Sequence, residues 1–200
     1  MAKATEKTRR LTQLALLVAI MLVLAFTPLG YLKLGPAIEI TFMVIPVAVG
    51  AILLGPASGA FLGGVFGLTS FIQCFGMSQF GATLLGIDAV RTFLVCIVSR
   101  VLMGWLCGLI FRALHHFDKT RFLSYAAASL SAALLNTVFF VGLLMLLFGQ
   151  SDFILGMRGG MNLIAFLAAF VGINGLVEAF VAFALGTAIS KAVSVVLARK

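Results

Sequence analysis

The chain has 200 residues, of which 62% are hydrophobic and 10% charged, and its formal net charge is +8. Soluble globular domains carry about 25% charged residues, so this composition excludes a soluble protein and indicates an integral membrane protein. The length fits one compact helix bundle and leaves no room for a separate soluble domain. We therefore expect residues 1–200 to form a single transmembrane domain.

Several function classes are excluded by what the chain lacks or by where its charges lie. Most basic residues lie between or beyond the apolar stretches, a placement that encodes membrane orientation and argues against nucleic-acid binding. The sequence contains no GxxxxGK[ST] motif and no HExxH motif, so ATP hydrolysis would have to come from another chain, and a zinc protease is excluded. The three cysteines have neither CxxC spacing nor histidine or acidic neighbours, so we expect packing residues and no metal site. The expectation is therefore a protein that is not an enzyme, with no catalytic residues and no cofactor.

Six apolar stretches are long enough to span a bilayer, which takes about 20 residues per helix. In chain order they are Leu11–Leu29, Ile38–Leu54, Ala57–Gly76, Asp88–Ala113, Phe122–Phe148 and Met161–Ser190. The second and third are separated only by Gly55 and Pro56, which predicts an antiparallel pair, and Pro46 should kink the second. The predicted fold is an all-α integral membrane bundle of six transmembrane helices.

The orientation of the bundle follows from its Lys and Arg residues. Three basic clusters fall on the same side when six spans are assumed: residues 3–10, residues 112–121 and residues 191–200. The opposite side keeps only Lys33, Arg91 and Arg158. Because positive charge marks the cytoplasmic side, both termini are predicted to be cytoplasmic.

Small residues recur at four-residue spacing in three of the predicted helices. Gly55, Gly59, Gly63 and Gly67 share one face of the third, and Gly104 and Gly108 repeat the pattern in the fourth. Such faces let helix backbones approach closely, so tight packing is predicted there. The first helix carries Ala15 and Ala19, a weaker signal for a flat patch that accepts a partner helix.

Polar residues at a common membrane depth are the main functional signal. Counting inward at about 1.5 Å per residue, Arg100, Asn136 and Asn174 all lie ~18–20 Å from the outer ends of their helices, and Glu178 follows Asn174 by one turn. Polar groups at this depth are costly and usually functional. Three helices thus contribute donors and acceptors to one layer.

Three interpretations of this layer stay open. In the first, Arg100 binds the carboxylate of a solute, Asn136 and Asn174 bind its hydroxyls and amides, and Gln73 and Asn162 extend the site outward. In the second, Arg100 pairs with Glu178 and locks the bundle. In the third, Glu178 titrates in a solitary proton-coupled carrier, although no inverted repeat is visible.

The chain resembles the substrate-binding S components of bacterial energy-coupling factor (ECF) vitamin transporters. The resemblance covers nearly the whole chain and rests on its length and six spans, Ala15–Ala19, the run 45–56 (IPVAVGAILLGP), the Gly59–Gly67 face with Leu68–Ser70, and the run 100–104 (RVLMG). It implies a protein of the bacterial plasma membrane that captures a vitamin outside and docks through Ala15 and Ala19 onto a transmembrane T component, which two cytoplasmic ATPases drive. The outer connections would then cover the solute.

Within that family the chain is most similar to the pantothenate-specific members, in which Arg100 and Asn136 match the positions expected to hold the solute. Pantothenate offers one carboxylate for Arg100, and two hydroxyls and an amide for Asn136 and Asn174. Riboflavin is the nearest rival because the many Phe residues could form its apolar walls. Folate and cobalamin are not excluded, since pocket volume cannot be obtained from sequence.

Overall fold

The structure is a computed structural model that describes residues 2–27, 30–33, 39–118 and 122–198, without the side chains of 2–5, 31–33, 39–40, 173–174 and 197–198. Its helices are α1 (Ala2–Phe26), α2 (Val44–Leu54), α3 (Pro56–Gln73), α4 (Gln79–Ile87), α5 (Ala89–His115), α6 (Leu123–Phe148), α7 (Asp152–Arg158), α8 (Leu163–Val181), the π-helix η1 (Ala182–Gly186) and α9 (Thr187–Ala198). Two short strands, β1 (Tyr31–Lys33) and β2 (Glu39–Thr41), pair antiparallel between α1 and α2.

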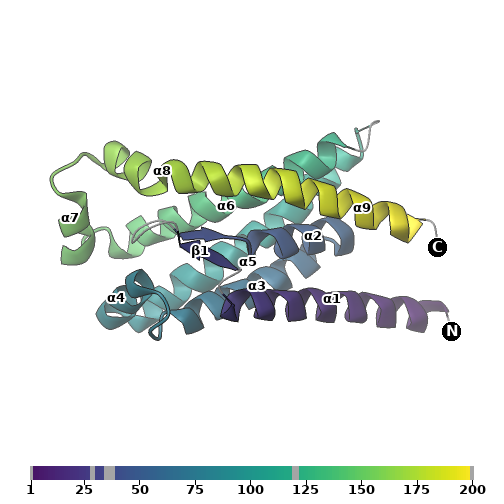
Figure 1. The fold of residues 1–200 in the computed structure, drawn as a ribbon, viewed down its shortest axis with the longest axis horizontal. Helices are drawn as coiled ribbons and strands as arrows, with labels where there is room; N and C mark the ends of the chain where they lie inside the picture. The colour runs from purple at the N-terminus through teal and green to yellow at the C-terminus, as the bar shows by residue number, and fades with distance from the viewer. Residues whose placement is uncertain (1, 28–29, 34–38, 119–121, 199–200) are drawn as a thin grey trace.

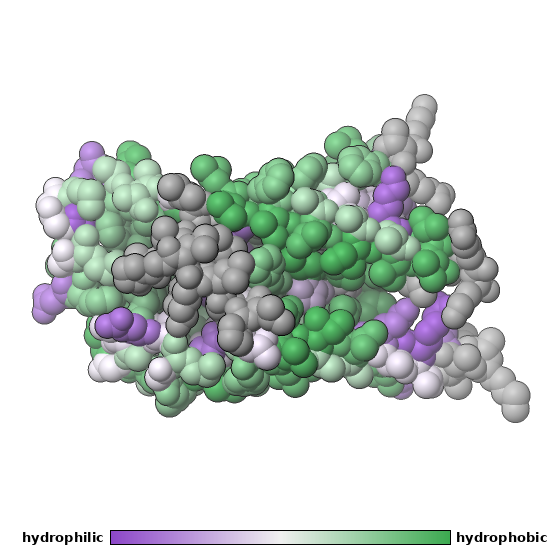
Figure 2. Space-filling model, viewed as in Figure 1, coloured by the Kyte–Doolittle hydropathy of each residue, from purple (hydrophilic) through white to green (hydrophobic). Residues whose placement is uncertain are grey.

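The predicted helical membrane fold is confirmed. Among the described residues, four helical segments are long and apolar enough to cross a membrane: Glu6–Phe26, Ala89–His115, Leu123–Phe148 and Gly175–Val196. A bent pair, Asp152–Arg158 with Leu163–Gly172, is a fifth candidate, and α2 is a shorter apolar helix. Figure 2 shows hydrophobic residues along the visible face, with hydrophilic residues gathered toward its two ends.

Several predicted boundaries were wrong, each for a local reason. The second helix begins at Val44 because residues 39–41 pair as a strand, so Pro46 lies in its first turn, where a missing N–H breaks no helical hydrogen bond. The segments taken as outer connections contain α4 and α7, which begin at side-chain caps from Ser78 and Ser151. The sixth helix breaks at Gly172, whose φ of 30° and ψ of −133° are not helical.

The bundle is arranged so that α1 begins and α9 ends at one end, while α4 and α7 lie at the opposite end (Figure 1). We call the latter the α4/α7 end. Placing both termini at one end agrees with the predicted topology, and the cytoplasmic side and the single-domain assignment remain predictions.

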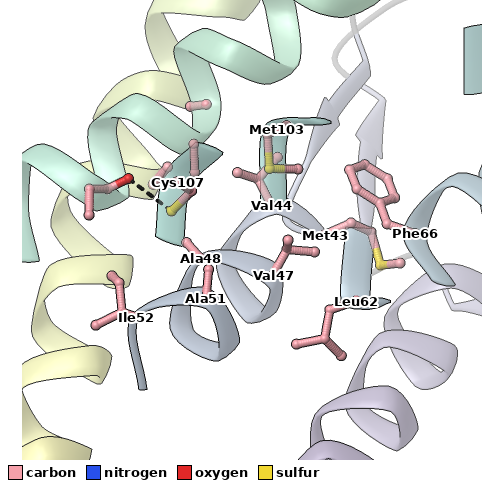
Figure 3. Packing of buried hydrophobic residues seen from close by; sticks show 14 of the residues in the cluster. Met43, Val44, Val47, Ala48, Ala51, Ile52, Leu62, Phe66, Met103 and Cys107 are labelled. Carbon is pink, nitrogen blue, oxygen red and sulfur yellow. Dashed lines mark hydrogen bonds between the residues drawn. The ribbon is translucent and has the colours of Figure 1, made fainter. Parts of the chain in front are cut away.

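The main apolar core surrounds α2, whose residues from Val44 to Ile52 are all buried. Figure 3 shows five of these residues, Val44, Val47, Ala48, Ala51 and Ile52, in one cluster with Leu62 and Phe66 of α3 and Met103 and Cys107 of α5. A second buried cluster lies at the α4/α7 end and joins α4, α5, α6, α7 and α8: Leu84, Val95, Leu144, Phe148, Ile154 and Phe166. The two clusters hold the helices apart around a cavity.

The predicted close packing of the glycine faces is confirmed between α3 and α5. A Cβ added to Gly59 or Gly63 would overlap the carbonyl oxygen of Gly104 or Arg100, and one added to Gly67 would lie 2.6 Å from the carbonyl oxygen of Cys96. Gly59, Gly63 and Gly67 therefore sit directly on the backbone of α5. This contact fixes the depth and rotation of the helix that carries Arg100.

Candidate functional site

A cavity of about 890 Å³ opens among α3, α4, α5, α6, α7 and α8 toward the α4/α7 end, a volume within the usual range for small-molecule sites. Its polar lining includes Arg100, Asn136, Gln73, Glu178 and the strand residue Thr41. Aromatic residues form much of the remaining wall: Phe66, Phe80, Phe140, Phe153, Phe166 and Phe170. The cavity thus combines a few polar groups with a largely apolar wall.

Arg100 lies on the cavity-facing side of α5, with its side chain 9% exposed. Its guanidinium stacks near the rings of Phe140 and Phe66, with the guanidinium carbon 4.6 Å and 5.4 Å from the ring centroids. Nη1 donates hydrogen bonds to Ser99 Oγ at 2.7 Å and to the carbonyl oxygen of Val95 at 3.2 Å. These contacts orient the guanidinium without neutralising it.

The charge of Arg100 has no anionic partner among the groups that the structure describes. Its Nε is buried without a hydrogen-bond partner, and so is Oδ1 of Asn136 on α6. An unpaired buried donor or acceptor costs about 1–3 kcal/mol, and more when the group is charged. The cavity is therefore lined by two residues, Arg100 and Asn136, that each bury a polar atom without a described hydrogen-bond partner.

Glu178 on α8 lines the same cavity, but no ion pair joins it to Arg100, as the second of the three interpretations would require. Its Oε1 accepts a hydrogen bond from the backbone N–H of Thr41 at 2.8 Å. The interpretation that these two charges lock the bundle is therefore not what the structure shows.

The remaining predicted residues lie in different settings. Gln73 lines the cavity, while its Nε2 donates to the carbonyl oxygen of Ala25 at 2.7 Å. Asn162 is exposed, and its Oδ1 accepts a hydrogen bond from the N–H of Ala165 at 2.7 Å, which makes it the N-cap of α8. The side chain of Asn174 lies outside the described residues. Roles for all three in solute binding remain predictions.

Two features of the cavity were not predicted from the sequence: the aromatic neighbours of Arg100, and the two cysteines that line the cavity wall. Cys74 and Cys96 line the cavity, whereas Cys107 lies in the main core and donates to the carbonyl oxygen of Ala128 (Figure 3). A usable signal was helical spacing, because Cys96 precedes Arg100 by four residues and Phe140 follows Asn136 by four. Residues four apart share a helix face, so these positions had to face the same space.

Residues 9–190 match the family model described as "ECF transporter, substrate-specific component". The chain belongs to this family. It is therefore the substrate-binding S component of an ECF transporter, a multi-pass protein of the bacterial plasma membrane and not an enzyme. S components pair with a T component and with ATPases, which supply the energy for transport.

One relative is similar to this S component over most of its length. The pantothenate transporter PanT of Leuconostoc mesenteroides subsp. mesenteroides is 31% identical over 141 residues, which cover 68% of this chain and 67% of that protein.

Proposed function

We propose that this S component captures pantothenate in the cavity at the α4/α7 end and delivers it to the transport complex. The observation that supports this most directly is Arg100, a buried guanidinium that is held in position and has no anionic partner within the described part of the chain. A carboxylate is the group that a guanidinium binds best, through two parallel hydrogen bonds. The similarity to a pantothenate transporter agrees with an acid as the solute.

The rest of the cavity suits the rest of pantothenate. Asn136 offers an unsatisfied amide oxygen to a hydroxyl or amide donor of the ligand, and the phenylalanine rings offer apolar surface to its two methyl groups. Buried polar groups give such a site its specificity, because a ligand that cannot satisfy them leaves them unpaired.

Calorimetric titration of the detergent-purified protein with pantothenate, then with riboflavin, tests the assignment. We expect saturable binding of pantothenate only, and a loss of about 30-fold or more in affinity for Arg100→Ala, since removing one partner of a buried charge pair costs about 2–5 kcal/mol. Arg112→Ala, at the other end of α5, is the matched control and should bind normally. Riboflavin binding would overturn the solute assignment and keep the family, and normal binding by Arg100→Ala would remove Arg100 from the site.

We propose further that Ala15 and Ala19 form the contact with the T component. Both are exposed on α1, on a face shared with the exposed side chains of Leu16 and Val23. Small residues on an open apolar face let another helix approach closely. Ala15→Trp should therefore abolish copurification with the T component while leaving pantothenate affinity unchanged. Leu176→Trp, at an exposed position of α8, serves as the control, and an intact complex with Ala15→Trp would contradict the proposal.

A further inference from the structure

The two-stranded sheet of β1 and β2 lies between α1 and α2 in the chain. β1 and β2 pair with Tyr31 opposite Thr41, and the N–H of Phe42 donates to the carbonyl oxygen of Gly30 at 3.0 Å. The sheet contacts α8 through β2, and Figure 1 shows it running beside that helix. A two-stranded ribbon is marginally stable alone, so its position depends on such outside contacts.

The contact with α8 is made by a carboxylate that membrane helices seldom contain. Glu178 accepts the N–H of Thr41 at 2.8 Å, although 137 positions separate the two residues. Acidic side chains in membrane helices are costly and usually pair with a cation or serve a function. Arg100 lines the same cavity, yet Glu178 bonds the strand.

The position of this hydrogen bond gives it a consequence for the ligand. Thr41 and Glu178 both line the cavity, so the bond closes part of the cavity wall where the strand meets α8. Glu178 also lies between the break at Gly172 and the π-helix η1, two interruptions of regular helical hydrogen bonding on either side of it. The bond therefore joins a two-stranded sheet, an arrangement that is only marginally stable alone, to a stretch of helix flanked by irregular backbone.

We propose that Glu178 is a positioning residue that fastens the β1–β2 sheet to α8 across the cavity and thereby slows release of the bound solute. The part concerning release rests on the proposed function; the fastening does not. A role as a direct ligand predicts that Glu178→Gln weakens binding and leaves the sheet unaffected. A fastening role predicts that Gln, which keeps an acceptor oxygen, largely preserves the sheet, whereas Ala releases it.

Hydrogen–deuterium exchange of the purified, ligand-free protein tests the fastening at the donor itself. In Glu178→Ala, the amides of the segment that contains Thr41 should exchange about 10-fold faster or more, as expected when the N–H of Thr41 loses its acceptor. Glu178→Gln should stay within a few-fold of the parent, and Leu176→Ala, on the same helix but exposed, should match it. Unchanged exchange in Glu178→Ala, or equally faster exchange in every helix, would overturn the proposal.

Thr41→Pro tests the same bond from the other side, because proline removes the donor N–H and leaves Glu178 intact. Oγ1 of Thr41 also accepts a hydrogen bond from the N–H of Met43 at 3.2 Å, and both substitutions remove it. Exchange of Phe42 and its neighbours that is clearly faster in Thr41→Pro than in Thr41→Val therefore supports the fastening. Equal effects of Pro and Val would contradict it, since the Thr41 side chain would then be responsible. This variant keeps the proposal testable if Glu178→Ala does not fold.

Dissociation of labelled pantothenate completes the test. We expect release about 10-fold faster from Glu178→Ala than from Glu178→Gln. Equal release rates with a loosened sheet would overturn the second half of the proposal and keep the first. If the parent protein binds no pantothenate, the proposed solute is wrong, and the amide exchange still decides whether Glu178 holds the sheet.

Discussion

The two sides of the cavity are built in opposite ways. On the α3–α5 side, glycines place one backbone against the other over several turns, and Phe71 meets Phe93 edge-on with centroids 5.2 Å apart. On the α8 side, the helix breaks at Gly172, continues into a π-helix, and leaves Ile164, Leu176 and Phe180 largely exposed. One side is held by direct packing of backbone on backbone, whereas the other is an irregular helix whose described contacts are made by side chains such as Phe166 and Phe170.

This difference assigns separate tasks to the two sides. A group that must meet a ligand carboxylate needs fixed geometry, and Arg100 belongs to the closely packed side. A wall that admits and releases a ligand needs contacts that break at low cost, and low-stability segments supply such motions. The Glu178–Thr41 bond belongs to that second side. The comparison therefore predicts a larger loss of stability from breaking the backbone contact between α3 and α5 than from straining α8.

The largest effect is expected for Gly63→Ala. The added Cβ would overlap the carbonyl oxygen of Arg100, and since neither backbone can yield locally, α3 and α5 must separate. We expect a loss of about 3 kcal/mol or more in the free energy of unfolding, measured as thermal or denaturant unfolding in detergent. Gly64→Ala is the matched control, because its Cβ would meet only a Val101 methyl at 3.7 Å. Similar stability of the two variants would refute the closely packed wall.

A smaller loss is expected for Gly172→Ala. A φ of 30° with a ψ of −133° is tolerated by glycine and strained for a residue with a Cβ, at a cost of about 1–3 kcal/mol. The same unfolding measurement applies, with Gly142→Ala on α6 as the control, since nothing lies within 4 Å of its added Cβ. A stabilised Gly172→Ala would mean that α8 runs straight through this position and that the contrast between the two walls is wrong.

The sequence predicted the α3–α5 side of the cavity better than the α8 side, for physical reasons. Four-residue spacing of glycine and the depth of Arg100 and Asn136 are properties of regular helices, which follow from local residue patterns. The strand at 39–41 was missed because an apolar run of this length fits a helix equally well. The partner of Glu178 could not be predicted, since a backbone N–H carries no sequence signature and lies 137 residues away. Irregular backbone and long-range hydrogen bonds were the unpredictable part.

The smallest expected effect is that of loosening the contacts by which α5 orients the guanidinium of Arg100. Ser99 Oγ accepts a hydrogen bond from the guanidinium at 2.7 Å and in turn donates to the carbonyl oxygen of Val95. Ser99→Ala removes this support but leaves the charge, so the guanidinium can rotate between the rings of Phe66 and Phe140. We expect pantothenate affinity to fall about 3- to 10-fold, the equivalent of one hydrogen bond, with the unfolding midpoint nearly unchanged.

Ser131→Ala on α6 removes a hydroxyl that likewise bonds a carbonyl of its own helix and should leave binding intact. An equal loss of affinity in both variants would show that Ser99 acts through helix stability. A loss confined to Ser99→Ala would show that the packed wall fixes the direction of the charge as well as its depth.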